Sequence, residues 1–108
     1  LGWNQWPPHP SGQSIGDSIS LAPDRPTEAE LLTVCSASGN PRDAARRSQT
    51  FPAAVAEDME GYAVAATCQV AGVQCDIIRG ISNVAGDRDK ANWDIDAAVE
   101  AVALLAFG

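Results

Sequence analysis

The sequence predicts a small α/β domain with a central mixed or parallel sheet flanked by helices. Two observations lead to this fold class. From residue 31 to residue 107, short apolar runs typical of buried strands alternate with longer segments of helical spacing. Hydrophobic residues make up 45% of the chain and charged residues 19%, which is the balance of a protein with a packed core. A length of 108 residues favours a single domain.

Residues 1–30 differ from the rest and predict an arm or loop rich in Pro, Ser and Gly. Five of the seven prolines lie in this segment, and they oppose regular helices and sheets. His9, the only histidine, stands between two prolines and is expected to be an ordinary surface residue. Apolar residues of the arm could cover another surface: Trp3, Trp6, Ile15, Ile19 and Leu21.

The first half of the globular part, residues 31–108, predicts two strands separated by a helix. Leu31–Cys35 is a continuous apolar run that ends in small residues, as a buried strand entering a loop does. Pro41–Gln49 begins with a proline suited to a first helical position and carries charges, so it predicts a short exposed helix. Ala53–Asp58 favours a second strand.

The second half predicts a helix, a strand and a final helix. Gly61–Ala71 has one face of small and apolar residues and is followed by Gly72 as a stop; that face consists of Ala63, Ala66, Thr67 and Val70. Val73–Ile81 is rich in β-branched residues and predicts a strand covered on both faces. Asp94 is placed to cap a helix from Ile95 to about Phe107.

Polar residues follow two of these strands. Met59-Glu60 comes after the second strand and Ser82-Asn83 comes after the third. Ligands of α/β sheets collect at the carboxyl ends of the strands. These positions therefore indicate a polar ligand site, although strand ends also carry polar residues in purely structural roles.

Charge and hydropathy exclude several classes of partner. The formal net charge is −7, so the phosphate backbone of a nucleic acid or an anionic membrane surface would be repelled on average. No apolar run approaches the roughly 20 residues of a membrane span. We expect a cytoplasmic protein that binds neither nucleic acid nor membrane.

Cofactor and metal motifs are absent from the sequence. Cys35, Cys68 and Cys75 form no CxxC pair, no histidine completes a zinc site, and the three are expected to be buried thiols. No glycine-rich phosphate-binding string occurs, and a serine triad is improbable with His9 alone. We expect no cofactor and no metal.

Two segments carry a family resemblance. Phe51–Gly61, which reads FPAAVAEDMEG, resembles the Met-Glu segment that opens a helix in nucleoside phosphorylases and nucleosidases. Arg79–Asn83, which reads RGISN, is similar to the next signature of that family, usually Arg-x-Ile-Ser-Asp. The continuation to Trp93 is similar to the futalosine hydrolases of the family. The resemblance extends from about residue 32 to residue 105 and implies a partial nucleoside phosphorylase-like fold.

The resemblance implies hydrolysis of a purine N-glycosidic bond. For the futalosine hydrolases, the reaction releases hypoxanthine from futalosine in menaquinone biosynthesis. Glu60 would accept hydrogen bonds from the ribose hydroxyls, which strengthen as positive charge develops on the sugar, and Met59 would contact the sugar. By spacing alone, Glu60 would instead be a helix N-terminal carboxylate favoured by the dipole.

Asn83 departs from the aspartate of most relatives. An amide offers a donor and an acceptor, which could pair with the N7 and O6 edge of a 6-oxopurine such as hypoxanthine. The alternative is an ordinary asparagine in a turn. Three further residues could orient this loop: Arg79, Ser82 and Asp87. The small-residue loop Ser38-Gly39-Asn40 would bring backbone groups to the base edge.

The chain is expected to be catalytically incomplete. The resemblance places the water-activating acidic residue, a Gly-rich segment and several strands in an N-terminal half that this chain does not match. We expect the chain to act as part of a nucleosidase completed by that half or by a partner, or else as a non-catalytic binding module. Alternatives within the enzyme class are a methylthioadenosine/S-adenosylhomocysteine nucleosidase and a purine nucleoside phosphorylase. Open sheet edges predict a homo-oligomer.

Overall fold

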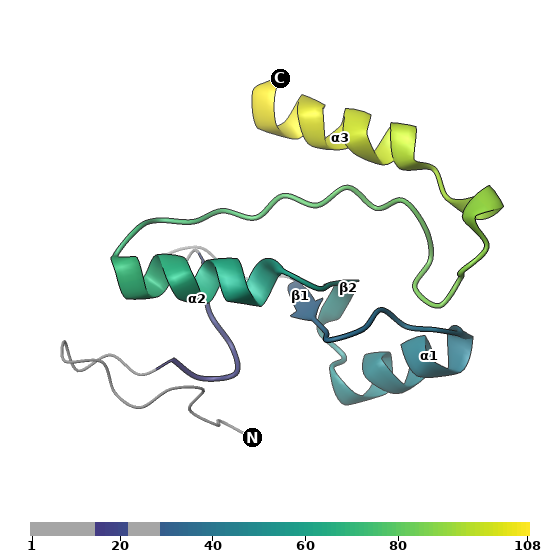
Figure 1. Cartoon of the computed structure of the whole chain (residues 1–108), viewed down its shortest axis with the longest axis horizontal. Coiled ribbons are helices and arrows are strands. Elements are labelled where there is room, and N and C mark those ends of the chain that lie inside the picture. The colour runs from purple at the N-terminus through teal and green to yellow at the C-terminus, as the bar shows by residue number, and fades with distance from the viewer. Residues whose placement is uncertain (1–14, 22–28) are drawn as a thin grey trace.

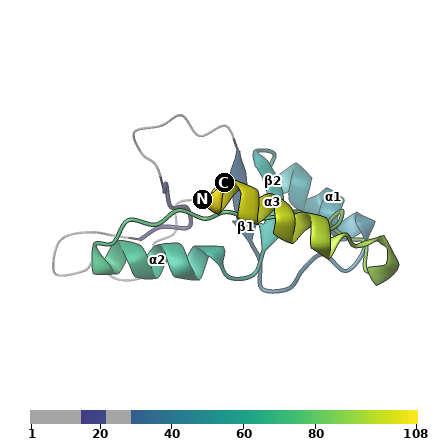
Figure 2. The ribbon, with the colours of Figure 1, turned by 90° about the horizontal axis from the view of Figure 1, so that it is seen from above.

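The computed structural model describes residues 15–21 and 29–108 and forms an α/β arrangement (Figure 1). Two parallel strands, β1 (Glu30–Thr33) and β2 (Ala54–Asp58), are joined through helix α1 (Pro41–Thr50). Helix α2 (Gly61–Ala71), the 3-10 turn η1 (Lys90–Asn92) and helix α3 (Ile95–Phe107) follow. In two perpendicular views, α1 and α2 lie to opposite sides of the strand pair (Figure 2).

The register of the two strands brings the ends of β1 and β2 together. Leu31 pairs with Ala56, Leu32 with Glu57, and Thr33 with Asp58, after an irregularity between Glu30 and Leu31. Val34 N–H then donates to the Asp58 carbonyl at 2.8 Å, which extends the parallel ladder by one bond. The loop after β1 and the Met59-Glu60 segment after β2 therefore leave the sheet at the same edge.

Local signals set the helix boundaries, and those predicted at Pro41, Gly72 and Asp94 are confirmed. Asn40 caps α1 by accepting from the Asp43 N–H at 2.9 Å, and Pro41 occupies the first turn, where its missing N–H costs nothing. Asp94 caps α3 through the Ala97 N–H at 3.0 Å. Gly72 ends α2 in the left-handed conformation, φ 68°, and its N–H bonds back to the helix carbonyls.

The buried core is small, and the predicted face of α2 is wrong. Of the four residues on that face, only Ala66 is buried, while the helix instead packs Gly61, Ala65 and Ala66 inward. The buried face differs from the predicted one because α2 packs against residues 15–21. Tyr62, on the same side of the helix as Ala65 and Ala66, donates its hydroxyl to the Gly16 carbonyl at 2.6 Å. The thiols are not fully buried either, since Cys35 is exposed and the other two are half-buried.

Val73–Ile81 is not a strand in this structure, which corrects the prediction. The segment leaves α2 and runs back past the strands as a long extended trace without sheet pairing (Figure 1). A strand requires a hydrogen-bonded neighbour, and in the described ranges the ladder bonds of the sheet join only β1 to β2. The β-branched residues of this segment therefore favour an extended backbone, but the segment does not join the sheet.

Helix α3 packs on this extended segment at Gly80. An added Cβ at Gly80 would lie 2.2 Å from the Ala98 carbonyl oxygen and 3.0 Å from Val102 Cγ2, so the helix backbone rests directly on the glycine. Ala98 is accordingly the buried residue of α3. Most of the remaining apolar surface of the helix faces outward, including Leu105 and Phe107.

The predicted arm, residues 1–30, lies largely outside the described residues, as do His9, Trp3 and Trp6. Of the described residues in this range, 15–21 pack on α2, where Ile15 is 4% exposed, and Glu30 is already the first residue of β1. No helix in the parts of the chain that the structure describes is long and apolar enough to cross a membrane.

Candidate functional site

Asp58, the last residue of β2, organises the junction between β2 and α2. Its side chain is 8% exposed. Oδ1 accepts from the Thr33 hydroxyl at 2.7 Å, and Oδ2 accepts from the Gly61 N–H at 3.0 Å. The Thr33 oxygen in turn accepts from the Tyr62 N–H at 2.8 Å. The end of β1 and the first turn of α2 are thus fixed to the same carboxylate.

Arg79 connects this junction to the extended segment. Its Nε and Nη2 donate to Asp58 Oδ2 at 3.0 and 2.8 Å, and Nη2 lies 3.7 Å from Glu60 Oε2. Burial alone would raise the pKa of Asp58, but hydrogen bonds from Thr33, Arg79 and Gly61, with the positive charge of Arg79, lower the pKa below its ordinary value. The carboxylate therefore stays ionised and keeps the guanidinium in place.

Glu60 and Met59 project from this junction into the open. The Glu60 side chain is 69% exposed and Met59 is 51% exposed. Glu60 occupies the cap position of α2 but makes no side-chain cap bond; one oxygen approaches the Met59 N–H at 3.3 Å. An exposed carboxylate beside a guanidinium and an apolar thioether can accept hydrogen bonds from a hydroxyl-bearing ligand.

The Asn83 amide is engaged within its own loop. Oδ1 accepts from the Ser82 hydroxyl at 2.7 Å, and Nδ2 donates to the carbonyls of Val84 at 3.1 Å and Asp87 at 3.4 Å. The Ser82 carbonyl accepts from the Asp94 N–H at 2.7 Å, which joins the loop to the start of α3. These bonds orient Asn83 before any ligand arrives.

Asp87 closes the same loop from its other end. Its carboxylate accepts from the Asp89 N–H and from Asn92 Nδ2, both at 2.9 Å, and its carbonyl accepts from Trp93 Nε1 at 2.9 Å. The Arg88 guanidinium stacks over the Trp93 ring, 5.4 Å from its centroid. Residues 82–94 therefore form a unit that is held together by its own hydrogen bonds.

The loop Ser38-Gly39-Asn40 lies against this unit at Gly86. Gly86 is buried with φ 90°, and an added Cβ would lie 2.5 Å from the Asn40 carbonyl oxygen. Only glycine fits a positive φ at such close approach. The structure thus places the two segments predicted to face the purine base side by side.

The sequence analysis did not predict the hydrogen bonds that Glu57 and Arg47 make to the loop that contains Ser38. Glu57 accepts from the Ser38 N–H at 2.7 Å, from its hydroxyl at 2.8 Å and from Arg47 Nη1 at 2.8 Å. Arg47 also donates to the Ser36 carbonyl at 2.7 Å. Ser38 is 1% exposed, so both of its polar groups serve the fold. Gly39 N–H donates to Asp43 at 3.2 Å.

Two groups of predicted residues emerge. Arg79 lies with Glu60, and the 38–40 loop lies with the loop of Asn83 and Asp87. Within the described ranges no hydrogen bond or ion pair joins Glu60 to Asn83; the chain itself links them through Arg79 and Ser82. The sequence does not predict which carboxylate Arg79 binds, because Asp58 and Glu60 are both close to the end of β2.

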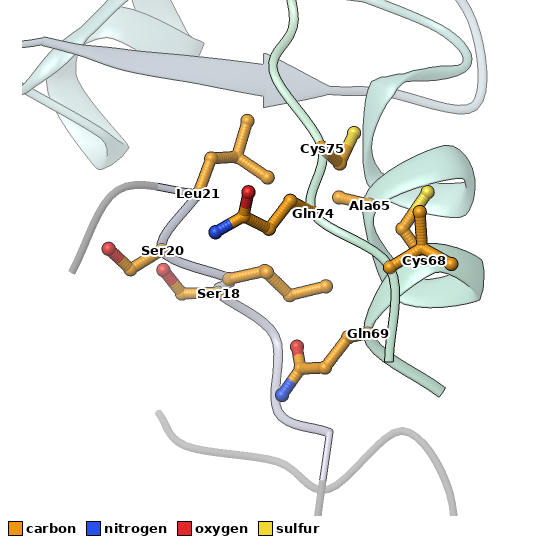
Figure 3. Close-up of a pocket in the computed structure, with 10 residues that line it drawn as sticks. Ser18, Ser20, Leu21, Ala65, Cys68, Gln69, Gln74 and Cys75 are labelled. Carbon is orange, nitrogen blue, oxygen red and sulfur yellow. The ribbon is translucent and has the colours of Figure 1, made fainter. Parts of the chain in front are cut away.

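A cavity of about 330 Å³ lies elsewhere, between residues 18–21, the second half of α2 and the segment after it (Figure 3). None of the predicted site residues lines it. Its walls are polar and open, with Gln69 and Gln74 beside Cys68 and Cys75 (Figure 3). No cluster of three metal-ligating side chains occurs in the described part of the chain.

Comparison with known proteins gives consistent similarities. A family model described as the phosphorylase superfamily matches residues 28–106. A futalosine hydrolase of Acidothermus cellulolyticus is 40% identical over 74 residues, 68% of this chain and 30% of the relative. A futalosine hydrolase of Streptomyces coelicolor is 32% identical over 96 residues, 89% of this chain and 39% of the relative.

A third relative, a futalosine hydrolase of Thermus thermophilus, is 47% identical over 47 residues, which is 44% of this chain and 21% of the relative. The chain thus spans less than two fifths of the length of each of these curated relatives. No solved structure matches the chain at a significant level.

Proposed function

Since this chain belongs to the phosphorylase superfamily, we propose that it forms part of a purine nucleosidase that hydrolyses the N-glycosidic bond of futalosine and releases hypoxanthine. The observation that carries the proposal is the Arg79 bridge. It holds the exposed Met59-Glu60 pair against the segment that continues into Ser82-Asn83. Two residue pairs 23 positions apart in the sequence, Met59-Glu60 and Ser82-Asn83, are thereby connected through Arg79.

The chemistry of the reaction requires a partner for each developing charge. As the glycosidic bond breaks, positive charge forms on the ribose and electron density moves to the base. An ionised Glu60 that accepts from the ribose hydroxyls stabilises the first charge, and Met59 supports the sugar through apolar contact. The guanidinium of Arg79, 3.7 Å from Glu60 Oε2, restrains the position of the Glu60 carboxylate.

Asn83 is proposed to meet the base. Oδ1 has a second lone pair beyond the bond from Ser82, and the weaker of the two Nδ2 bonds, at 3.4 Å, leaves a hydrogen that a ligand can recruit. The Nδ2 donor suits O6 of hypoxanthine, and the Oδ1 acceptor suits N7 when the departing base carries a proton there. We propose that Ser38, Gly39 and Asn40 complete the base side through their position beside Gly86, and that Ser82 and Asp87 hold the loop.

A non-catalytic binding module is the second candidate. The observation that favours it is coverage, because the chain matches only 30% and 39% of the length of two relatives. The family resemblance implies that the acid that would activate water lies in the part that is not matched. A methylthioadenosine-type nucleosidase is less favoured because Asn83 replaces the proton-donating aspartate and because of the Gly86–Lys90 loop. A purine nucleoside phosphorylase is less favoured because the sequence shows no recognisable phosphate-binding residues. We propose a cytoplasmic setting for either candidate.

A chimera tests the proposal. The 74 matched residues of the Acidothermus futalosine hydrolase are replaced by the aligned residues of this chain, and hypoxanthine release from futalosine is followed for the chimera and for the chain alone. We expect turnover only from the chimera. A folded chimera that binds futalosine without turnover favours the binding module, and turnover by the isolated chain contradicts the need for completion.

A further inference from the structure

Cys68 and Cys75 lie on adjoining elements and line one wall of the cavity described above (Figure 3). Cys68 belongs to the last turns of α2, and Cys75 lies in the extended segment that follows it. The nucleosidase proposal uses neither residue. Their proximity therefore requires a separate explanation.

The turn after α2 brings them together. Gly72 adopts φ 68°, and the Val73 N–H donates to the Cys68 carbonyl at 2.9 Å, which reverses the chain at the helix end. Two residues later Cys75 lies beside the end of α2 and lines the same cavity wall as Cys68 (Figure 3). Burial and the neighbouring Cys68 thiol raise the pKa of the Cys75 thiol. The reversal of the chain at Gly72 therefore brings the two cysteines together at the end of α2.

We propose that Cys68 and Cys75 form a thiol pair that is oxidised to an intramolecular disulfide by disulfide-class oxidants. One thiolate attacks a sulfur of the oxidant, which releases the first reagent thiol and leaves a mixed disulfide. The second cysteine then attacks the protein sulfur and releases the second reagent thiol. Two protein thiols are oxidised, one reagent disulfide is reduced, and both protons leave on the reagent thiols.

The two cysteines share the cavity with polar groups that admit a reagent. Gln69, Gln74, Ser18 and Ser20 lie around them, and both cysteines are half-buried, not enclosed. Cys35 offers an internal comparison because it is exposed and follows β1 at a distance from the cavity. The disulfide would tie the end of α2 to the segment that leads to Arg79.

Oxidised glutathione applied to the whole 108-residue chain tests the pair, with products identified by intact mass and peptide mapping. Cys35→Ser is the matched control, and Cys68→Ser and Cys75→Ser remove the partners. We expect Cys35→Ser to lose the mass of two hydrogens and to carry a Cys68–Cys75 link. Effective concentrations on the order of millimolar predict about tenfold more internal link than mixed disulfide at ~0.1 mM reduced glutathione.

Each partner variant, combined with Cys35→Ser, should instead stop at a single glutathione adduct on the remaining cysteine of the pair. Circular dichroism of the reduced variants checks that the fold is retained. Two separate adducts on Cys35→Ser, a link from Cys35 to either partner in the wild type, or no oxidation of the folded chain would each overturn the proposal.

Discussion

Two consecutive carboxylates at the end of β2 serve opposite sides of the molecule. Successive strand residues point to opposite faces, so Glu57 reaches the Ser38 loop and Arg47, whereas Asp58 reaches Thr33 and Arg79. One strand end therefore positions both the loop proposed to face the base and the arginine beside Glu60. Residue identity alone indicated neither pairing, since the chain has five other arginines and lysines.

Glu57→Gln should destabilise the chain by about 1–3 kcal/mol at neutral pH, because Arg47 keeps its position but loses its carboxylate partner. Burial raises the pKa of Glu57, but hydrogen bonds from Ser38 and Arg47 outweigh this and lower the pKa below its ordinary value. Ionised Glu57 therefore adds to the free energy of unfolding at pH values above the ordinary pKa of a glutamate. This stabilisation is lost as the pH falls through the lower pKa of Glu57 in the folded protein.

Urea denaturation of the wild type and of Glu57→Gln at neutral and acidic pH measures this effect. The difference between the two proteins should shrink in acid, where the wild-type side chain also becomes neutral. Glu100→Gln, at an exposed position on α3, is the control and should change little. A Glu57 effect that is independent of pH would show that the ion pair does not stabilise the fold.

Asn83→Asp tests whether the Asn83 side chain hydrogen-bonds the purine base. A carboxylate has no donor for the base O6 and also faces the carbonyls of Val84 and Asp87, so some loss of loop order is expected for every substrate. The selective effect is a fall in hypoxanthine release relative to adenine release from matched nucleosides, by about tenfold to a hundredfold. In the chimera, equal losses for both bases would show that Asn83 braces the loop without contacting the base.

At the scale of elements, local signals predicted the helices and the parallel pair. The caps at Asn40, Asp94 and Gly72 are encoded within a few residues, so sequence reasoning places those helix ends closely. The prediction of a strand over Val73–Ile81 is wrong because a strand needs a hydrogen-bonded neighbour, which the local sequence pattern does not specify. The buried face of α2 likewise depends on residues 15–21, which are remote in sequence.

Gly86→Ala should separate the two loops of the base side, whereas Gly72→Ala should not. Both glycines have positive φ, so both substitutions incur a backbone cost of about 1–2 kcal/mol. At Gly86 the added Cβ also meets the Asn40 carbonyl at 2.5 Å, while at Gly72 no atom lies within 4 Å.

Thermal denaturation compares these two variants, and hydrogen exchange reports on residues 36–41. Gly86→Ala should lower the melting temperature more and should speed exchange in that loop. Equal thermal losses with unchanged exchange would mean that the contact between the loops does not hold them together.

Over the whole molecule, apolar side chains remain on the surface. Val55 is 73% exposed, Leu105 is 74% exposed and Phe107 is 89% exposed. Apolar surface of this kind marks association sites when it is contiguous, and β1 and β2 also leave outer edges without ladder partners in the described residues. The chain therefore resembles a part of a larger packing unit.

Sedimentation velocity should show the isolated chain as a dimer or larger species at micromolar concentration. The chimera should expose less apolar surface per chain and bind a hydrophobic dye more weakly, because the remainder of the relatives' fold is present to cover these faces. A compact monomer of the isolated chain across the concentration range would contradict the association.

The proposed function depends most on Glu60, which is positioned beside Arg79 and is proposed to stabilise the charged ribose of a purine nucleoside. The most direct measurement is kcat for hypoxanthine release from futalosine by the chimera, compared among wild type, Glu60→Gln and the control Glu100→Gln. Loss of a preorganised charged partner should lower kcat by about a hundredfold to a thousandfold, with the control unchanged. A folded Glu60→Gln chimera that releases hypoxanthine at the wild-type rate would contradict this role of Glu60.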